Sequence, residues 1–145
     1  MKLASFFSLA SLAVCAFAQT IEIGYPNHNT HIKPGKQFIV QVNRPDTLTS
    51  SQEVAIVISL LQCPKNGHCP KPSDDLGIAL YAGPYNPQFP TTHTPQDVPQ
   101  QNFTVKVPSS FKTNETAQLA VTHLSLVGAG PFPLFEIKNV TLKVQ

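Results

Sequence analysis

The sequence predicts an all-β protein: a single antiparallel β-sandwich of the immunoglobulin or fibronectin-III type, with about seven strands. Two observations support this prediction. After Gln19 no stretch has the apolar spacing of an amphipathic helix, whereas short β-rich runs recur between Pro, Gly and Asn residues. No internal repeat or linker divides the chain. One compact domain is therefore the natural packing of these strands.

Each predicted strand is a run of apolar residues with its own facing pattern. In the second run Phe38, Val40 and Val42 share one face. The third run, EVAIVISLL, is apolar on both faces, which is typical of a central strand that is covered on both sides. The predicted strands are, in order, Thr20–Gly24, Gln37–Val42, Glu53–Leu61, Leu76–Tyr81, Asn102–Val107, Thr116–Val127 and Leu134–Val144.

The last strand contains a change in alternation. Phe135 and Ile137 have one parity, and the apolar residues from Val140 onward have the other. Placing both sets in the core requires one extra residue. We therefore predict a β-bulge at Lys138 and Asn139, with both of these side chains facing solvent.

His123 marks a similar change of parity in the preceding strand, between Val121 and Leu124. A bulge and a strand buried on both faces are the two alternatives there. A histidine inside an apolar strand is more often a hydrogen-bonded structural residue than a catalytic base. The chain has neither a G-x-S-x-G elbow nor an H-E-x-x-H motif. We therefore expect no enzymatic activity.

Residues 1–18 have the pattern of a secretory signal peptide. Lys2 gives a positive start, the run 3–17 is apolar, and AFA at 16–18 has the small-x-small form that places cleavage before Gln19. The apolar run is short for a bilayer-spanning helix, and no later run approaches about 20 apolar residues. We expect a secreted, extracellular protein without a membrane anchor, whose β-sandwich domain is residues 19–145.

The charge of the chain is nearly balanced. Ten Lys and Arg residues stand against eight Asp and Glu residues, for a formal net charge of +2, and the basic residues are scattered. Binding to nucleic acid or to an anionic membrane requires a clustered basic face. We expect neither partner.

Loss of the signal peptide would remove Cys15 and leave Cys63 and Cys69. In an oxidising compartment this pair favours a disulfide. A zinc site would need four ligands, and this loop offers two thiols and His68. A thioredoxin-type redox motif has two residues between its cysteines, whereas here there are five. The sequence predicts a disulfide that pins one loop, and it predicts no cofactor.

Two further polar motifs are candidate sites. Asn102, Asn114 and Asn139 each begin an Asn-x-Thr sequon at a position predicted to reach solvent, so they are candidates for N-glycosylation. His28 and His31, in NHNTH, are two ligands of the kind that copper or zinc uses. No third ligand lies near them in the sequence, and we predict no metal site.

A proline-rich passage, GPYNPQFPTTHTPQDVP (83–99), reads as a long exposed loop because it lacks periodicity and many ladder donors. It carries Tyr85, Phe89 and His93, and Tyr81 comes just before it. Its prolines lower the entropy cost of presenting these side chains. We identify these four residues as a candidate protein-binding loop. The alternative is that the aromatic side chains pack onto the edge of the sandwich.

Four stretches resemble the fungal necrosis-inducing secreted protein family (the Nis family), whose members are small secreted effectors. They are VNRPDTLTSSQEVAIVISLLQC (42–63), CPKPSDDLGIALYAGPYNPQF (69–89), QNFTVKVPSSF (101–111) and AQLAVTHLSLVGAGPFPLFEIKNVTLKV (117–144). The resemblance covers almost the whole predicted mature chain. It implies a non-enzymatic protein that some fungi use against plant hosts, binding plant immune receptor-type or receptor-associated kinases and damping pattern-triggered defence.

A carbohydrate-binding or structural module associated with the cell wall is the alternative function. IKPGKQFIVQV (32–42) has the Gly-turn-strand form of many extracellular sandwich domains. The absence of Trp for sugar stacking and of a Ser/Thr-rich stalk disfavours this reading. Its partner would be a cell-wall polysaccharide.

We expect the secreted protein to begin at Gln19, because signal peptidase accepts the AFA sequence before it. Mass spectrometry of protein collected from culture medium measures this, with pyroglutamate as an expected form of the new N-terminus. Secreted protein that still carries residues 1–18 would contradict the prediction.

Overall fold

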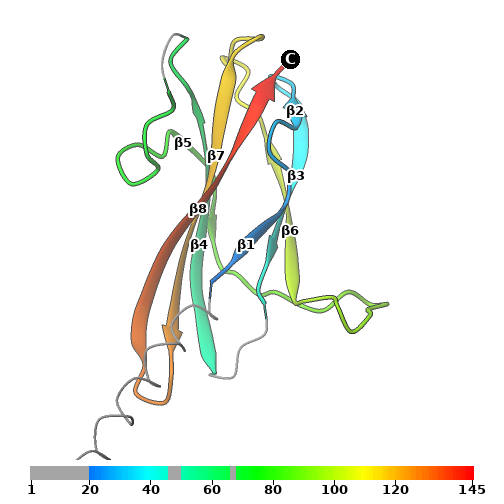
Figure 1. Ribbon diagram of the computed structural model, residues 1–145, viewed down its shortest axis with the longest axis vertical. Helices are drawn as coiled ribbons and strands as arrows, with labels where there is room; N and C mark the ends of the chain where they lie inside the picture. Colours follow the sequence, from blue (N-terminus) through cyan, green and yellow to red (C-terminus); the bar gives the residue numbers. More distant parts are fainter. Residues whose placement is uncertain (1–19, 46–49, 66–67) are drawn as a thin grey trace, which may run out of the picture.

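The computed structural model describes residues 20–45, 50–65 and 68–145 (Figure 1). The predicted signal peptide and its cleavage site lie outside these residues. Within them the regular secondary structure consists of eight strands, which confirms the all-β prediction. The strands are β1 (Glu22–Tyr25), β2 (His31–Ile32), β3 (Gln37–Asn43), β4 (Ser51–Gln62), β5 (Ile78–Gly83), β6 (Gln100–Lys106), β7 (Thr116–Val127) and β8 (Phe132–Val144).

The strands form two sheets, which lie as two layers in Figure 1. One sheet has the order β1-β3-β6 and the other the order β2-β8-β7-β4-β5. All neighbouring strands are antiparallel except β2 and β8, which run parallel. Each predicted strand corresponds to one of these elements. The added strand, β2, has two residues, too few to show a period of two in the sequence.

The core lies between the two sheets. In β6 the alternation of the sequence is followed, with Phe103 and Val105 buried and Thr104 exposed between them. Burying such side chains contributes about 1.5–3 kcal/mol each. The sheets meet through buried apolar residues from both layers: Ile21, Ile32, Val40, Val42, Ile56, Ile58, Leu60, Tyr85, Phe103, Val105, Val107, Phe111, Ala117, Leu119, Val121, Leu142 and Val144.

The predicted bulge at Lys138 and Asn139 is wrong. β8 pairs with β7 without a shift of register along the whole of β7. Phe135 therefore lies on the outer face, 64% exposed, and Ile137 lies on that face half-buried. The inner-face position between them is Glu136. The apolar residues of β8 change parity because its inner face becomes polar at this end. The strand therefore needs no extra residue.

A bulge occurs in β4 instead. Glu53 pairs with Ser125 and Ala55 pairs with Leu124, so Val54 is the extra residue of the strand, and its side chain is exposed. Because of this bulge, Glu53 lies on the same face as the buried Ile56 despite their odd spacing. The sequence run EVAIVISLL hides this bulge because Val54 is itself apolar.

β7 resolves the alternatives for His123. The strand alternates without a bulge, and His123 points toward the core with Val121. The other face of the strand is buried at Gln118 and Ala120 and half-buried at its far end. The first half of β7 is thus covered on both faces, as the second alternative expects.

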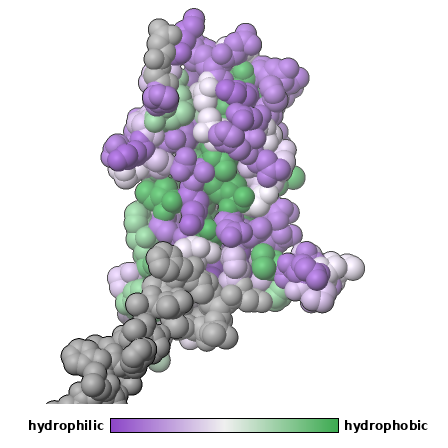
Figure 2. Space-filling view, viewed as in Figure 1, coloured by the Kyte–Doolittle hydropathy of each residue, from purple (hydrophilic) through white to green (hydrophobic). Residues whose placement is uncertain are grey.

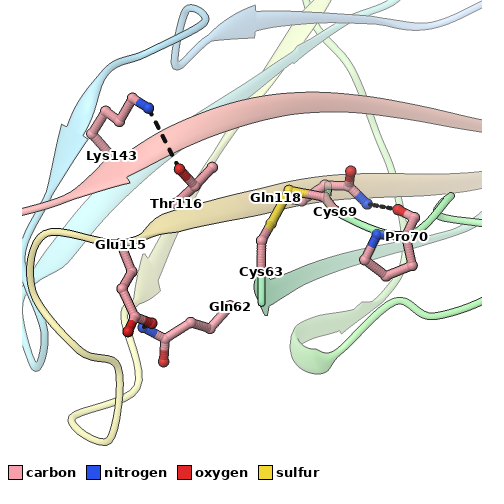
Figure 3. Close-up of a disulfide and its surroundings, with 8 residues drawn as sticks. All are labelled: Gln62, Cys63, Cys69, Pro70, Glu115, Thr116, Gln118 and Lys143. Atoms are coloured by element: carbon pink, nitrogen blue, oxygen red, sulfur yellow. Dashed lines mark hydrogen bonds between the residues drawn. A yellow bond between two sulfur atoms is a disulfide. The ribbon is translucent and has the colours of Figure 1, made fainter. Parts of the chain in front are cut away.

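The predicted disulfide between Cys63 and Cys69 is confirmed, with a Cα–Cα distance of 4.8 Å (Figure 3). It closes the loop that follows β4. The side-chain amide of Gln118 on β7 donates to the carbonyl of Pro70 at 3.0 Å, and the backbone N–H of Cys63 donates to the carbonyl of Thr116 at 2.9 Å. These bonds hold the loop against the buried end of β7.

We expect replacement of Cys63 and Cys69 together by Ser to lower the free energy of unfolding by about 2 kcal/mol without abolishing the fold. The loop is short, so the bond removes little entropy from the unfolded chain, and the core does not depend on it. Urea unfolding followed by circular dichroism measures this. A double variant that is unfolded in buffer would show that the disulfide supports the whole domain.

Candidate functional site

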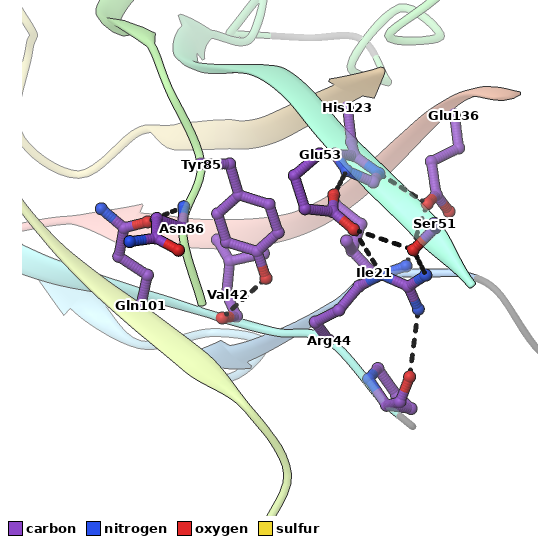
Figure 4. Close-up of polar contacts among 11 residues, drawn as sticks. Ile21, Val42, Arg44, Ser51, Glu53, Tyr85, Asn86, Gln101, His123 and Glu136 are labelled. Carbon is purple, nitrogen blue, oxygen red and sulfur yellow. Dashed lines mark hydrogen bonds and ion pairs between the residues drawn. The ribbon is translucent and has the colours of Figure 1, made fainter. Parts of the chain in front are cut away.

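Four charged or titratable residues meet between the sheets, at the end where β8 has its polar inner face; we call them the charged cluster (Figure 4). They are Arg44, Glu53, His123 and Glu136. The ring of His123 is fully buried. Its Nδ1 lies 3.0 Å from Oε1 of Glu136, its direct partner across β7 and β8. Its Nε2 contacts Oε2 of Glu53, which the bulge in β4 turns inward.

Arg44, at the end of β3, joins the second sheet to this cluster. Its Nε lies 2.9 Å from Oε1 of Glu53, and its Nη2 donates to Oγ of Ser51 at 2.7 Å. The backbone N–H of Ile21 donates to Oε1 of Glu136 at 3.0 Å. The chain is therefore fixed to carboxylates of the larger sheet both just before β1 and just after β3.

For both Glu53 and His123, burial and hydrogen bonding shift the pKa in opposite directions. Burial alone would raise the pKa of Glu53, but hydrogen bonds from His123 and Arg44 outweigh it and hold the pKa below its usual 4.5. Burial alone would lower the pKa of His123, but hydrogen bonds with Glu136 and Glu53 outweigh it and raise the pKa above its usual 6.5. The cluster thus favours a histidinium between two carboxylates.

The chemistry open to His123 follows from these contacts. Both ring nitrogens are engaged by carboxylates and the ring has no exposed surface. A general base needs a free nitrogen within reach of substrate. His123 is instead a structural histidine that links β4, β7 and β8.

Tyr85 covers the cluster from the side of the proline-rich loop. Its ring lies 5.5 Å from that of His123 in an edge-on arrangement, and its hydroxyl donates to the carbonyl of Val42 at 3.2 Å. Burial raises the pKa of Tyr85, so the phenol stays protonated and can donate. The side chain is 3% exposed. This placement corrects the expectation that Tyr85 is presented to a partner: its ring fills the core beside the cluster.

The other predicted loop residues divide into two groups. Tyr81 lies in β5, with its ring 4.7 Å from that of Phe103 and its hydroxyl donating to the carbonyl of Pro84. Phe89 is 45% exposed, and its ring lies 5.1 Å from that of His93, which is also exposed. The alternative reading, packing onto the sandwich, therefore holds for the first two aromatics and not for Phe89 and His93.

The outer part of the loop projects away from the sandwich near the start of β6 (Figure 1). Backbone bonds between Gln88 and Gln100 close its base. Near its tip the carboxylate of Asp97 accepts hydrogen bonds from the backbone N–H and the hydroxyl of Thr94, at 2.6 and 3.0 Å. These bonds lower the pKa of Asp97. The loop that carries Phe89 and His93 is thus held at both its base and its tip.

The three sequons lie on different parts of the surface. Asn102 is on β6, Asn114 precedes β7 in a left-handed conformation with φ of 63°, and Asn139 is on β8. All three side chains are exposed, as the sequence predicts. Glycosylation at each of them remains a prediction.

The described residues contain no group of three or more His, Cys, Asp or Glu side chains arranged to hold a metal ion. His28 and His31 are both exposed. A groove of about 420 Å³ runs beside the disulfide loop, lined in part by His68, Glu115 and Gln118. In the part of the chain that the structure describes, no helix is long and apolar enough to cross a membrane.

The sequence alone did not reveal the charged cluster. His123 was expected to be a hydrogen-bonded structural residue, but the predicted bulge in β8 gave Glu136 the wrong face. The useful signal was the one carboxylate or imidazole that each long strand contains: Glu53, His123 and Glu136. Their convergence depends on strand order and register, which no single strand contains.

These features describe a small, disulfide-pinned, all-β domain with a structural charged cluster and an aromatic loop that projects beside the start of β6. The model of the Nis1 family matches residues 16–143, so the chain belongs to the Nis1 family. Membership indicates a small effector-like protein. A search of curated proteins finds no match.

The pKa shifts in the cluster predict a pH optimum of stability. Stability from His123 is fully present below its unfolded-state pKa, near 6.5, and is lost as the pH rises through its raised folded-state pKa. Stability from Glu53 is present above its unfolded-state pKa, near 4.5, and is lost as the pH falls through its lowered folded-state pKa. The free energy of unfolding should therefore be highest in mildly acid solution, between these two values.

We expect His123→Gln to lower the free energy of unfolding by about 3 kcal/mol in mild acid. The change removes the buried cation between the two carboxylates and leaves Glu53 with Arg44 alone. It should also flatten the decline of stability above neutral pH. Urea unfolding over a pH series measures both effects. His28→Gln, an exposed histidine outside the cluster, is the control and should keep the wild-type profile. An unchanged pH profile in His123→Gln would contradict the assignment.

Proposed function

We propose that this protein acts in the extracellular space by binding another protein, without catalysis, and that the outer part of its proline-rich loop contributes to the contact. The observation that carries this proposal is the exposed ring pair of Phe89 and His93 on a projecting loop. Exposed aromatic side chains that a partner can enclose are the typical anchors of protein interfaces.

The order of the loop supports the proposal. The bonds between Gln88 and Gln100 at the base and between Thr94 and Asp97 at the tip fix the backbone before a partner arrives. Tyr85 adds an attachment in the core. A loop that is already ordered loses less conformational entropy on binding, so more of the contact energy appears as affinity.

The class of partner comes from the family. A chain of the Nis1 family is effector-like, and the resemblance implies plant immune receptor-type or receptor-associated kinases as partners. We propose that binding to such a kinase damps defence signalling. The face in Figure 2 is mostly hydrophilic, with hydrophobic residues gathered at mid-height.

We expect the double variant Phe89→Ala, His93→Ala to weaken binding to kinase domains by about 1–3 kcal/mol while leaving the melting temperature unchanged, since both side chains are outside the core. Isothermal titration calorimetry against purified kinase domains of plant immune receptors measures the affinity. Phe132→Ala removes a ring that is also exposed, on β8, and is the matched control.

Two results would count against parts of this proposal. Wild-type affinity in the double variant would remove the loop from the interface. Tight binding to chitin or glucan, with none to any kinase domain, would favour the cell-wall module instead.

A further inference from the structure

β8 has one edge that is only partly paired. Its even-numbered residues bond to β7, as the bond from Val144 N to the carbonyl of Glu115 shows, so its odd-numbered residues face the opposite edge. On that edge the carbonyl of Thr141 accepts from Asn29 N at 2.7 Å, and Lys143 N donates to the carbonyl of Thr30 at 3.0 Å. The segment around β2 therefore covers only the C-terminal end of this edge.

The rest of the edge is open. Within residues 20–45, 50–65 and 68–145, no backbone group bonds to Phe135, Ile137 or Asn139 on this side. Pro133 has no N–H and ends the open stretch on one side, and Thr141 ends it on the other. The open stretch is thus 134–140, and its midpoint is Ile137. A groove of about 340 Å³ lies along it, between the second half of this stretch and residues 20–23.

We propose that a second copy of this chain binds this edge, β8 against β8 and antiparallel, about a two-fold axis through Ile137. The two larger sheets would then form one continuous sheet. In this register Ile137 pairs with itself, and Phe135 pairs with Asn139 of the second copy, each pair exchanging both backbone hydrogen bonds. The pairing uses the whole open stretch of both copies, which no other symmetric register does.

Charge selects the same register. Pairing about Ile137 places Glu136 of each copy directly opposite Lys138 of the other, on one face and at a close, non-hydrogen-bonded pair. Symmetric registers centred on Glu136 or Lys138 would set like charges against each other. Oε2 of Glu136 can accept a hydrogen bond from Lys138 of the second copy. It is buried without a hydrogen-bond partner, and Nζ of Lys138 in its own chain is 3.8 Å away.

Charged residues at a sheet edge normally oppose pairing with other strands. Here Glu136 and Lys138 disfavour pairing with an unrelated strand, but they meet opposite charges in a second copy. The same charges therefore prevent aggregation and specify the partner. The outer face adds an apolar contribution. Phe135 is the most exposed of the large apolar side chains, and Ile137, Leu124 and Leu126 lie half-buried on the same face. Pairing would bring the two copies of Ile137 together there.

Asn139 affects how this must be tested. Its side chain lies on the outer face and, in the proposed pair, beside Phe135 of the second copy. A glycan at Asn139 would crowd that position. The measurements therefore use the secreted chain with Asn139→Gln, which removes the sequon without changing the backbone.

Sedimentation equilibrium over a concentration series is expected to show a monomer–dimer equilibrium. In the same background Ile137→Pro removes the N–H at the centre of the open edge and leaves every bond to β7, so the dissociation constant should rise about tenfold or more. Lys138→Glu, which sets Glu136 against a glutamate, should do the same. Lys112→Glu makes the same charge change on an exposed loop residue and should leave the constant unchanged. Circular dichroism checks that each variant is folded.

A cross-link tests the register. Ile137→Cys places two thiols on the proposed axis, at the Cα separation of antiparallel neighbours, and mild oxidation should give a covalent dimer. Ile39→Cys, on the outer face of the smaller sheet and more exposed than Ile137, should not. A chain that is monomeric up to about 1 mM would overturn the proposal. So would a dimer that forms equally well in Ile137→Pro and in Lys138→Glu.

Discussion

The contact between His123 and its two carboxylates is the interaction on which the arrangement of this domain most depends. It joins β4, β7 and β8 directly, and through Arg44 and the backbone of Ile21 it also fixes the chain where it enters and leaves the smaller sheet. Burying charges is costly, and such groups often add little net stability over apolar residues. The contacts require the observed alignment, because β4, β7 and β8 must bring Glu53, His123 and Glu136 to one point.

The cluster also accounts for two irregularities of the long strands. The extra residue in β4, Val54, is what turns Glu53 inward, and a regular strand would send that carboxylate to solvent. In β8 the inner-face position is taken by Glu136, so Phe135 and Ile137 are displaced to the outer face. The exposure of Phe135 is thus a consequence of a polar residue at the adjacent core position.

The proline-rich loop connects this interior to the surface. Tyr85 packs edge-on against His123, while Phe89 and His93, a few residues later, are exposed on the outer part of the same loop. One passage thus contains both an internal attachment and a candidate contact. The interface that the loop would form and the pairing that β8 would form lie on separate elements, so neither depends on the other.

The all-β class, the seven longer strands, the disulfide and the exposure of the three sequons could be predicted from the amino-acid sequence. These follow from local rules: period-two alternation, turn residues, and the proximity of Cys63 and Cys69 along the chain. The tertiary structure alone decided the two-residue strand β2, the position of the bulge, and which loop aromatics are buried. Val54 and Phe135 show why. Both are apolar and fit a core face in a single strand. They lie outside because Glu53 and Glu136, their neighbours in the same strands, turn inward to contact His123 of β7.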